Sequence, residues 1–331
     1  MSVDLSTCVC RYGPPAAAVE AFAALGPEQL REHPYRAAAA LTAAYAEYLD
    51  VEPGRLVVGR GASEFIWRLA RSPLADRVAV PLPAYTEYVL AFPGANRGGP
   101  GAARSGVHHG LAEIDALLGE GRVVLISNPH NPSGRALPAD ELAAVAQANS
   151  AGLLVVDESY VEFVAEPERF TLVGRAGANV VVLRSPSKFF GLAGCRVAVA
   201  LAGARRWREL LAPVGSWPVS QIEVAPVVGA LAARAWQRET RAALQADAAW
   251  LDGRLASIGT VVEGSVAHFR LVPADDAATC AAALARAGVG VRVLDASHGL
   301  GGPHLRIAAC RLDERDLVAS ALTATRASRG R

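Results

Sequence analysis

Residues 180–188 read VVVLRSPSK, a short apolar run followed by a turn of small polar residues and a lysine. An uninterrupted apolar run of this length is typical of a strand buried on both faces of a sheet. Similar short strands are predicted at residues 55–58, 77–80, 123–127 and 153–157, and helical stretches at 63–70, 138–149 and 225–251. The pattern predicts an α/β fold whose large, mostly parallel sheet carries helices on both faces.

The two ends of the chain have a different pattern. Residues 1–16 show neither helical nor alternating periodicity and are predicted to form an extended arm, and residues 16–49 are helical with a break at His33-Pro34-Tyr35. The C-terminal part favours a small α+β domain, with strands at 261–262, 266–271, 289–293 and 305–309 and helices at 277–287 and from 314. We therefore predict an arm at 1–16, the N-terminal part of the small domain at 17–48, a large domain at 49–240 and a small C-terminal domain at 241–331.

Composition excludes several classes of partner. The 33 basic and 32 acidic residues are interspersed and give a net charge of +1, so no basic block for nucleic acid or membrane surfaces is expected. The sequence shows no secretory signal and no long apolar segment, which predicts a cytoplasmic protein. Five cysteines lack CxxC spacing, and the pair Cys8 and Cys10 has no further ligands nearby, so we predict no metal site. A small molecule is the expected partner.

Lysine is unusually rare in this chain. Of the 33 basic residues only Lys188 is a lysine, so 33 − 1 = 32 are arginines. A genomic bias towards arginine at positions that need only a positive charge explains most of this excess. Arginine stays protonated, whereas a buried lysine can lose its proton and act as a nucleophile. The one lysine is therefore predicted to do chemistry that requires a free amine.

The segment Gly-Arg-Gly-Ala-Ser-Glu at 59–64 links the first strand to a helix. The free amides of Ala62 and Ser63 at that helix N-terminus would suit an anion such as phosphate. A dinucleotide loop is the alternative, but its third glycine is missing. The next strand also ends in Val80 and Pro81, without an acidic residue for a ribose.

Other polar residues follow the later strands. Asn131 lies in Asn-Pro-His-Asn-Pro-Ser-Gly at 128–134, and Asp157 begins Asp-Glu-Ser-Tyr, which ends at Tyr160. The stretch at 180–188 supplies serines and Lys188, and Arg196 follows eight residues later. All of these residues follow the carboxyl ends of predicted strands, and open α/β sheets bind ligands at that edge. Together these residues supply an amine for an aldehyde, an acid for a pyridine nitrogen and donors for a phosphate, which are the needs of a pyridoxal phosphate enzyme.

The motifs Asn-Pro-x-Asn-Pro-Ser-Gly, Asp-x-x-Tyr and Ser-x-Ser-Lys, in this order, resemble those of the class I/II aminotransferase superfamily of fold type I. The resemblance implies that Lys188 binds pyridoxal phosphate as a Schiff base and moves the proton at the substrate α-carbon, and that Asp157 keeps the ring nitrogen protonated. It implies that Asn131 and Tyr160 bind the ring oxygen. The implied phosphate ligands are Ser185, Ser187, Arg196 and the amides of Ala62 and Ser63.

The same resemblance covers nearly the whole chain. It implies that Tyr85 stacks on the cofactor ring and that Arg306 binds the substrate carboxylate. It also implies a homodimer with active sites at the interface, in which either His33 or Tyr35 reaches the partner's phosphate. The arm departs from the family, because Cys8, Cys10 and Arg11 stand where the family has other residues. This departure leaves the identity of the substrate undetermined.

The chain looks nearest the short branch that contains histidinol-phosphate aminotransferase and threonine-phosphate decarboxylase. We predict an aminotransferase acting on a small amino acid or amine, with a role in specialised biosynthesis. A decarboxylase or lyase of the same fold is the alternative, because both reactions start from the same bound substrate and differ in the bond held in line with the ring orbitals. A ligand-sensing module without catalysis is the third hypothesis.

Overall fold

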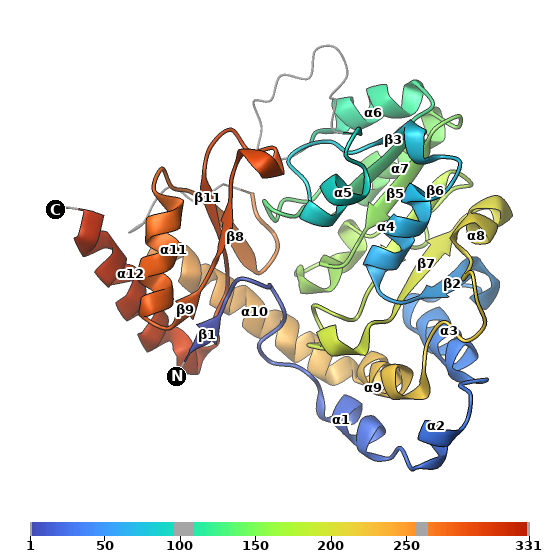
Figure 1. Cartoon of the computed structure of the whole chain (residues 1–331), viewed down its shortest axis with the longest axis horizontal. Coiled ribbons are helices and arrows are strands. Elements are labelled where there is room, and N and C mark those ends of the chain that lie inside the picture. Colours follow the sequence, from blue (N-terminus) through green and yellow to red (C-terminus); the bar gives the residue numbers. More distant parts are fainter. Residues whose placement is uncertain (1, 96–108, 256–263, 330–331) are drawn as a thin grey trace.

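The computed structural model describes residues 2–95, 109–255 and 264–329. Its largest sheet has six strands in the order β2-β7-β6-β5-β4-β3 (Figure 1). The strands are β2 (Leu56–Gly59), β3 (Val78–Ala79), β4 (Val123–Ser127), β5 (Leu153–Asp157), β6 (Val180–Arg184) and β7 (Ala198–Ala202). Strands β3 to β6 are parallel, and β7 runs antiparallel to both of its neighbours. The predicted mostly parallel sheet is confirmed, although β7 was not predicted.

Helices cover both faces of this sheet. Alternate residues of β5 enter different cores: Leu153 and Val155 join one, while Leu154 and Val156 join the other. The first core contains α4 (Ala62–Ala70), α5 (Thr86–Ala91) and α8 (Arg205–Leu211). The second contains α3 (Ala37–Leu49), α6 (Leu111–Gly119), α7 (Ala139–Ala148) and α9 (Gln221–Ala232). Burial on both sides explains why the strands are apolar throughout.

The long helix predicted at 225–251 is two helices. Helix α9 begins four residues earlier, where the Ser220 hydroxyl accepts from the Glu223 amide and the Glu223 carboxylate accepts from the Ser220 amide, which is a capping box. It ends at Ala232, with Ala233 as its C-cap, after which α10 (Arg234–Leu255) begins. Helices α1 (Ala16–Ala23) and α3 pack against α9, and α2 (Glu28–Arg31) also contacts it. A Cβ atom at Gly229 would collide with the backbone of Ala17, so the glycine permits the close approach of α1.

The C-terminal part forms a smaller sheet in the order β10-β11-β8, packed beside helices α11 and α12. Its elements are β8 (Phe269–Pro273), α11 (Ala277–Arg286), β9 (Val289–Gly290), β10 (Arg292–Leu294), β11 (His304–Ala308) and α12 (Arg315–Arg329). The strand predicted at 289–293 is divided, because β9 pairs with β1 (Val3–Asp4) of the arm while β10 pairs with β11. The strand predicted at 261–262 lies outside the described residues.

Short 3-10 helices complete the described chain. They are η1 (Pro53–Arg55), η2 (Ala75–Arg77), η3 (Val161–Phe163), η4 (Pro167–Arg169), η5 (Ala193–Cys195), η6 (Ala296–His298) and η7 (Leu312–Glu314). In Figure 1 the arm runs between the small sheet and the C-terminal end of the large one. The domain boundaries at residues 16, 48 and 240 stay predictions.

Candidate active site

The ends of β4, β5 and β6 bring the predicted site residues to one edge of the sheet. The amide of Asn128 donates to the carbonyl of Asp157 over 3.0 Å, and the amide of Glu158 donates to the carbonyl of Leu183 over 2.9 Å. The amide of Asn131 donates to the hydroxyl of Ser127 over 2.9 Å. These bonds continue the sheet pairing past the strands, so the loops that carry the functional side chains are fixed relative to one another.

Asp157 is a buried carboxylate with three donors. Its side chain accepts from the Tyr88 hydroxyl at 2.9 Å and from the amide and hydroxyl of Ser159 at 2.9 and 2.5 Å. Burial raises the pKa of Asp157, and these hydrogen bonds oppose that rise. A carboxylate held in this way can pair with a protonated nitrogen. Tyr88 was not predicted, and it reaches Asp157 from α5.

Lys188 lies at the turn after β6, where its Nζ donates to the carbonyl of Thr7 in the arm over 3.0 Å. Burial lowers the pKa of Lys188, and the positive charges of Arg306 and Arg196 lower it further, while Cys8 and Asp157 oppose them. The local environment therefore favours the neutral amine that nucleophilic attack requires.

Arg196 and the start of α4 form a cradle. Gly61, the residue before the helix, has φ of +80°, and a Cβ atom there would lie 2.7 Å from Nη2 of Arg196. The guanidinium therefore lies against the helix N-terminus, where the amides of Ala62 and Ser63 are free of helical partners. Positive charge and free amides together suit a phosphate.

The two serines of the turn after β6 are both buried. The Ser185 hydroxyl donates to that of Ser187 over 2.9 Å. The amide of Ser187 also donates to the Ser185 hydroxyl, over 3.3 Å. The two hydroxyls are thus held next to each other, directly before Lys188.

Arg306 comes from β11 of the small sheet and reaches the same place. Its Nη1 donates to Oδ1 of Asn131 over 2.6 Å, and its Nη2 donates to the carbonyl of Ser6 over 2.7 Å. The side chain is 8% exposed and lies over the ring of Phe269, and its Nε has no partner among the described residues. A buried guanidinium with a free donor suits a carboxylate.

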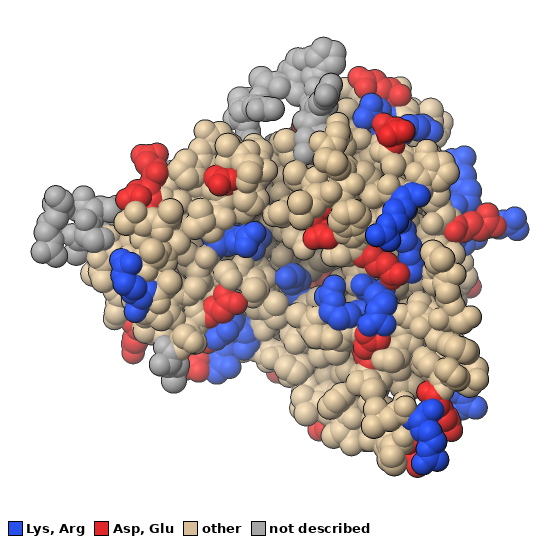
Figure 2. Space-filling view, in the orientation of Figure 1, with Lys and Arg blue, Asp and Glu red and all other residues tan. Residues whose placement is uncertain are grey.

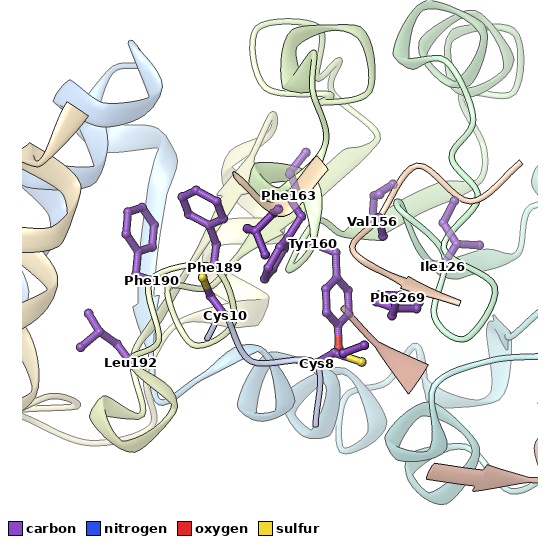
Figure 3. Packing of buried hydrophobic residues seen from close by; sticks show 14 of the residues in the cluster. Cys8, Cys10, Ile126, Val156, Tyr160, Phe163, Phe189, Phe190, Leu192 and Phe269 are labelled. Carbon is purple, nitrogen blue, oxygen red and sulfur yellow. The ribbon is translucent and has the colours of Figure 1, made fainter. Parts of the chain in front are cut away.

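Two tyrosines line the same space. Tyr85 precedes α5, and its ring meets that of Tyr88 edge to face with centroids 5.4 Å apart. Burial raises the pKa of Tyr85, and a hydrogen bond with Ser63 opposes that rise. Tyr160 is buried with its ring edge to face against Phe269, 5.1 Å between centroids (Figure 3). Every predicted site residue thus lies at the junction of the sheet edge, α4 and the small sheet.

Some neighbours of the site were not predicted. His130 links two loops, with Nδ1 2.7 Å from the Ser133 hydroxyl and Nε2 2.8 Å from the carbonyl of Pro83. The carbonyls of Ser6 and Thr7, which bind Arg306 and Lys188, belong to the backbone and leave no sequence signal. His130 lies inside the quoted 128–134 motif, so its position in a turn between site residues was the available signal.

A buried ion-pair network lies directly behind these loops. Arg184, the last residue of β6, bonds to Glu158 at 3.0 Å and also to Glu162. All three side chains are buried, and Glu158 further accepts from the amide of Leu172 at 2.6 Å. The network joins the residue after Asp157 to the residue before Ser185, and so ties the two loops together.

The wider surface adds little to this picture. Figure 2 shows Lys and Arg side chains along the hollow between the two parts of the molecule, with Asp and Glu side chains beside them. Within residues 2–95, 109–255 and 264–329, no helix has the length and apolar character needed to cross a membrane. The same part of the chain contains no group of three His, Cys, Asp or Glu side chains placed to hold a metal ion.

These groups fit pyridoxal phosphate. Lys188 offers an amine of lowered pKa, Asp157 offers a buried carboxylate, and the cradle at Gly61 and Arg196 offers donors for a phosphate. The Nε of Arg306, which has no partner among the described residues, leaves a donor for an anionic group of the substrate beside them.

Comparison with known proteins gives the family. The model of "Aminotransferase class I and II" matches residues 1–322. Histidinol-phosphate aminotransferase of Granulibacter bethesdensis is 32% identical over 335 residues, covering 97% of this chain and 89% of that protein. Histidinol-phosphate aminotransferase 1 of Bradyrhizobium diazoefficiens is 34% identical over 295 residues, covering 84% of this chain and 81% of the relative.

A solved structure agrees in fold. The histidinol-phosphate aminotransferase of Sinorhizobium meliloti, solved in complex with pyridoxal-5'-phosphate, aligns with a TM-score of 0.85 at 22% identity, covering 99% of this chain and 91% of that one. This confirms fold type I. The relatives do not favour the decarboxylase alternative. The chain belongs to the class I and II aminotransferases and is an enzyme that uses pyridoxal 5'-phosphate.

Proposed function

We propose that this aminotransferase takes its amino group from a phosphorylated amine, with histidinol phosphate as the first candidate. The relatives that cover most of the chain are histidinol-phosphate aminotransferases. One observation carries the proposal: Arg292 pairs with Arg306 across β10 and β11, so the two side chains leave the same face of the small sheet. Arg292 is exposed and makes no ion pair among the described residues. A second cation beside Arg306 supports a substrate with an anionic group.

The cofactor would be held by the residues already described. In this proposal Asp157 binds the ring nitrogen, and Asn131 and Tyr160 bind the ring oxygen. Tyr85 stacks on the ring. The phosphate ligands would be Ser185, Ser187, Arg196 and the amides of Ala62 and Ser63. The support is that these side chains lie together at the sheet edge, with Arg196 against the N-terminus of α4.

When bound, pyridoxal phosphate supplies a ring that takes up the electron pair of a bond broken at the substrate α-carbon. Lys188 would bind the cofactor, and its released amine would take the proton from that carbon. The lowered pKa of Lys188 supports this role, because a base must be unprotonated to accept a proton. Arg306 and Asn131 would hold the substrate above the ring.

The test is a single turnover followed by absorbance. Histidinol phosphate added to the loaded enzyme without a keto acid should convert the cofactor to pyridoxamine phosphate, and histidinol without its phosphate should do so more weakly. Arg292→Ala should remove most of that preference while leaving the reaction with unphosphorylated amines. Equal reaction with both compounds would refute the phosphorylated donor, and release of carbon dioxide from an amino acid would refute the transamination itself.

We also propose a homodimer. An exposed apolar surface, here called the α1–α2 surface, supports it; it comprises Val19, Phe22, Leu30, Tyr35, Val214, Trp217 and Ile222. Trp217 stacks on His33 at 4.2 Å between centroids and meets the edge of Tyr35 at 5.6 Å. Soluble proteins rarely leave such a surface open, and a second copy would cover it. Either His33 or Tyr35 would then reach the partner's site.

A matched pair of variants tests the dimer. Leu30 and Leu312 are both 73% exposed, but Leu30 belongs to the α1–α2 surface and Leu312 to η7 in the small domain. Leu30→Asp should shift the mass measured by light scattering from dimer to monomer, while Leu312→Asp should leave it unchanged. A wild-type protein that is monomeric at micromolar concentration would refute the proposal. We propose that the enzyme is cytoplasmic; its five cysteines are free thiols, as is usual in a reducing compartment.

A further inference from the structure

His268 is a buried histidine just before β8 that the proposed reaction does not use. It is 1% exposed, and its ring stacks on Phe163 with centroids 3.7 Å apart and planes 13° apart. Its Nε2 lies 3.1 Å from the carbonyl of Cys8 in the arm. Because a carbonyl can only accept, Nε2 carries the proton. Burial lowers the pKa of His268 to about 3, so the ring is neutral, and its Nδ1 has no partner among the described residues.

Cys8 has an unusual backbone conformation. Its φ is +54°, in the left-handed region that residues with a side chain rarely adopt. Hydrogen bonds hold the chain on both sides: Nζ of Lys188 donates to the carbonyl of Thr7 over 3.0 Å, and the amide of Cys10 donates to the carbonyl of Lys188 over 2.9 Å. Between these two anchors, the carbonyl of Cys8 has His268 as its donor. The bond from His268 is thus a further point at which the turn at residues 7–10 is held.

The conformation places the Cys8 thiol inside the site. The residue is 1% exposed, and Figure 3 shows it beside the hydroxyl end of Tyr160. The thiol forms a side-chain hydrogen bond with Arg306 and lies close enough to Lys188 for the two groups to interact, so it is near the groups that would hold substrate and cofactor. Burial raises the pKa of Cys8, and the thiol is a small neutral group at neutral pH.

We propose that His268 is a positioning residue: by donating to the Cys8 carbonyl, it keeps the Cys8 thiol in the wall of the substrate site between Tyr160, Lys188 and Arg306. The inference rests on the proposed function, because it treats this space as the place where the amine binds. His268 itself would touch neither substrate nor cofactor. A neutral ring fits that role, since it fixes the backbone without adding a charge next to the buried guanidinium of Arg306.

Two variants separate the hydrogen bond from the packing. His268→Phe keeps an aromatic ring against Phe163 but cannot donate, whereas His268→Gln loses the ring but keeps a nitrogen donor near the position of Nε2. The first measurement is the rate at which iodoacetamide alkylates Cys8 in the cofactor-loaded protein. Tandem mass spectrometry distinguishes Cys8 from Cys10.

We expect His268→Phe to be alkylated at Cys8 about five-fold faster than wild type, which is the loss of one hydrogen bond of about 1 kcal/mol. His268→Gln should be alkylated at nearly the wild-type rate. The proposal is overturned if the Phe variant reacts as slowly as wild type, or if the Gln variant reacts as fast as the Phe variant. Similar free energies of unfolding for the two variants in urea show that the difference in alkylation rate is local.

The second measurement uses steady-state kinetics with histidinol phosphate. His268→Phe should raise KM by a similar factor of about five with a smaller change in kcat, and His268→Gln should restore it. Faster alkylation with an unchanged KM would overturn the proposal, because Cys8 would then not line the substrate site. If wild type fails to react with any amine, the proposed function fails, while the alkylation rates still decide whether His268 holds the arm.

Discussion

Replacement of Asp157 by asparagine removes a charge while keeping the shape of the side chain. The asparagine oxygen can accept from the amide of Ser159, and its NH2 group can face Tyr88, whose hydroxyl can turn to accept. The variant should therefore fold. What it loses is the ion pair with a protonated ring nitrogen, and losing one partner of a buried pair costs about 3–5 kcal/mol. At about 1.36 kcal/mol per tenfold, single-turnover transamination should slow by about 10²- to 10⁴-fold.

In the cofactor-free protein, the same substitution should favour the folded state as pH rises. Burial raises the pKa of Asp157 in the folded state above its unfolded value of about 3.9. A group of this kind contributes stability that is fully present below the unfolded pKa and is lost as pH rises through the folded pKa. Asp157→Asn lacks this dependence, so the free energy of unfolding of wild type should fall relative to that of the variant as pH rises from about 4 towards 7.

Urea unfolding at several pH values, without cofactor, measures the second effect, and stopped-flow absorbance measures the first. Asp115→Asn is the control, because Asp115 is an exposed carboxylate whose partner among the described residues is Asn149. It should change neither quantity. The reasoning is refuted if Asp157→Asn keeps its rate within tenfold of wild type, or if the two stability curves stay parallel across this pH range.

Three further substitutions test other parts of the site. Lys188→Arg should abolish the absorbance of covalently bound cofactor and lower transamination by at least about 10⁴-fold, because arginine cannot supply a free amine; retained absorbance would contradict this. Gly61→Ala should weaken cofactor retention in dialysis, since its Cβ would meet Arg196 2.7 Å away at a φ of +80°; unchanged retention would remove the phosphate from this cradle. Arg184→Met should lower the free energy of unfolding in urea by about 3–5 kcal/mol, because it leaves two buried glutamates without their cation. Arg175→Met, which breaks an exposed ion pair, should lower it by less than about 1 kcal/mol. Equal losses in the two variants would refute the contrast.

Part of this fold could be predicted from sequence because its strands are apolar on both faces. The bounds of β4 and β5 match the prediction, β6 occupies the apolar run that begins at Val180, and the polar motifs begin where these strands end. Strand β7, which reads AVALA, was missed, since alternating alanines give neither a strand nor a helix pattern. Its antiparallel direction depends on pairing between β2 and β6, which only the assembled sheet defines.

The residues of the site likewise fall into those that the sequence predicts and those that it does not. Residues in motifs, such as Asp157 and Lys188, could be identified because their chemistry follows from residue type and order. Tyr88 could not, because its bond to Asp157 joins α5 to a strand 69 residues away. His268 could not either, since its partner is a backbone carbonyl 260 residues distant. Contacts of this kind arise from tertiary packing and leave no local pattern in the chain.

The arm that passes over Lys188 also affects the order in which the protein can be completed during synthesis. Strand β1 pairs with β9, and Arg11 binds Glu314, 303 residues further along the chain. The ribosome therefore makes the arm long before the segments that receive it. Until those last residues emerge, the large sheet can assemble, but the backbone contacts of Ser6 with Arg306 and of Cys8 with His268 cannot form. A nascent chain stalled before β8 should thus contain the lysine and its sheet, but lack one wall of the site.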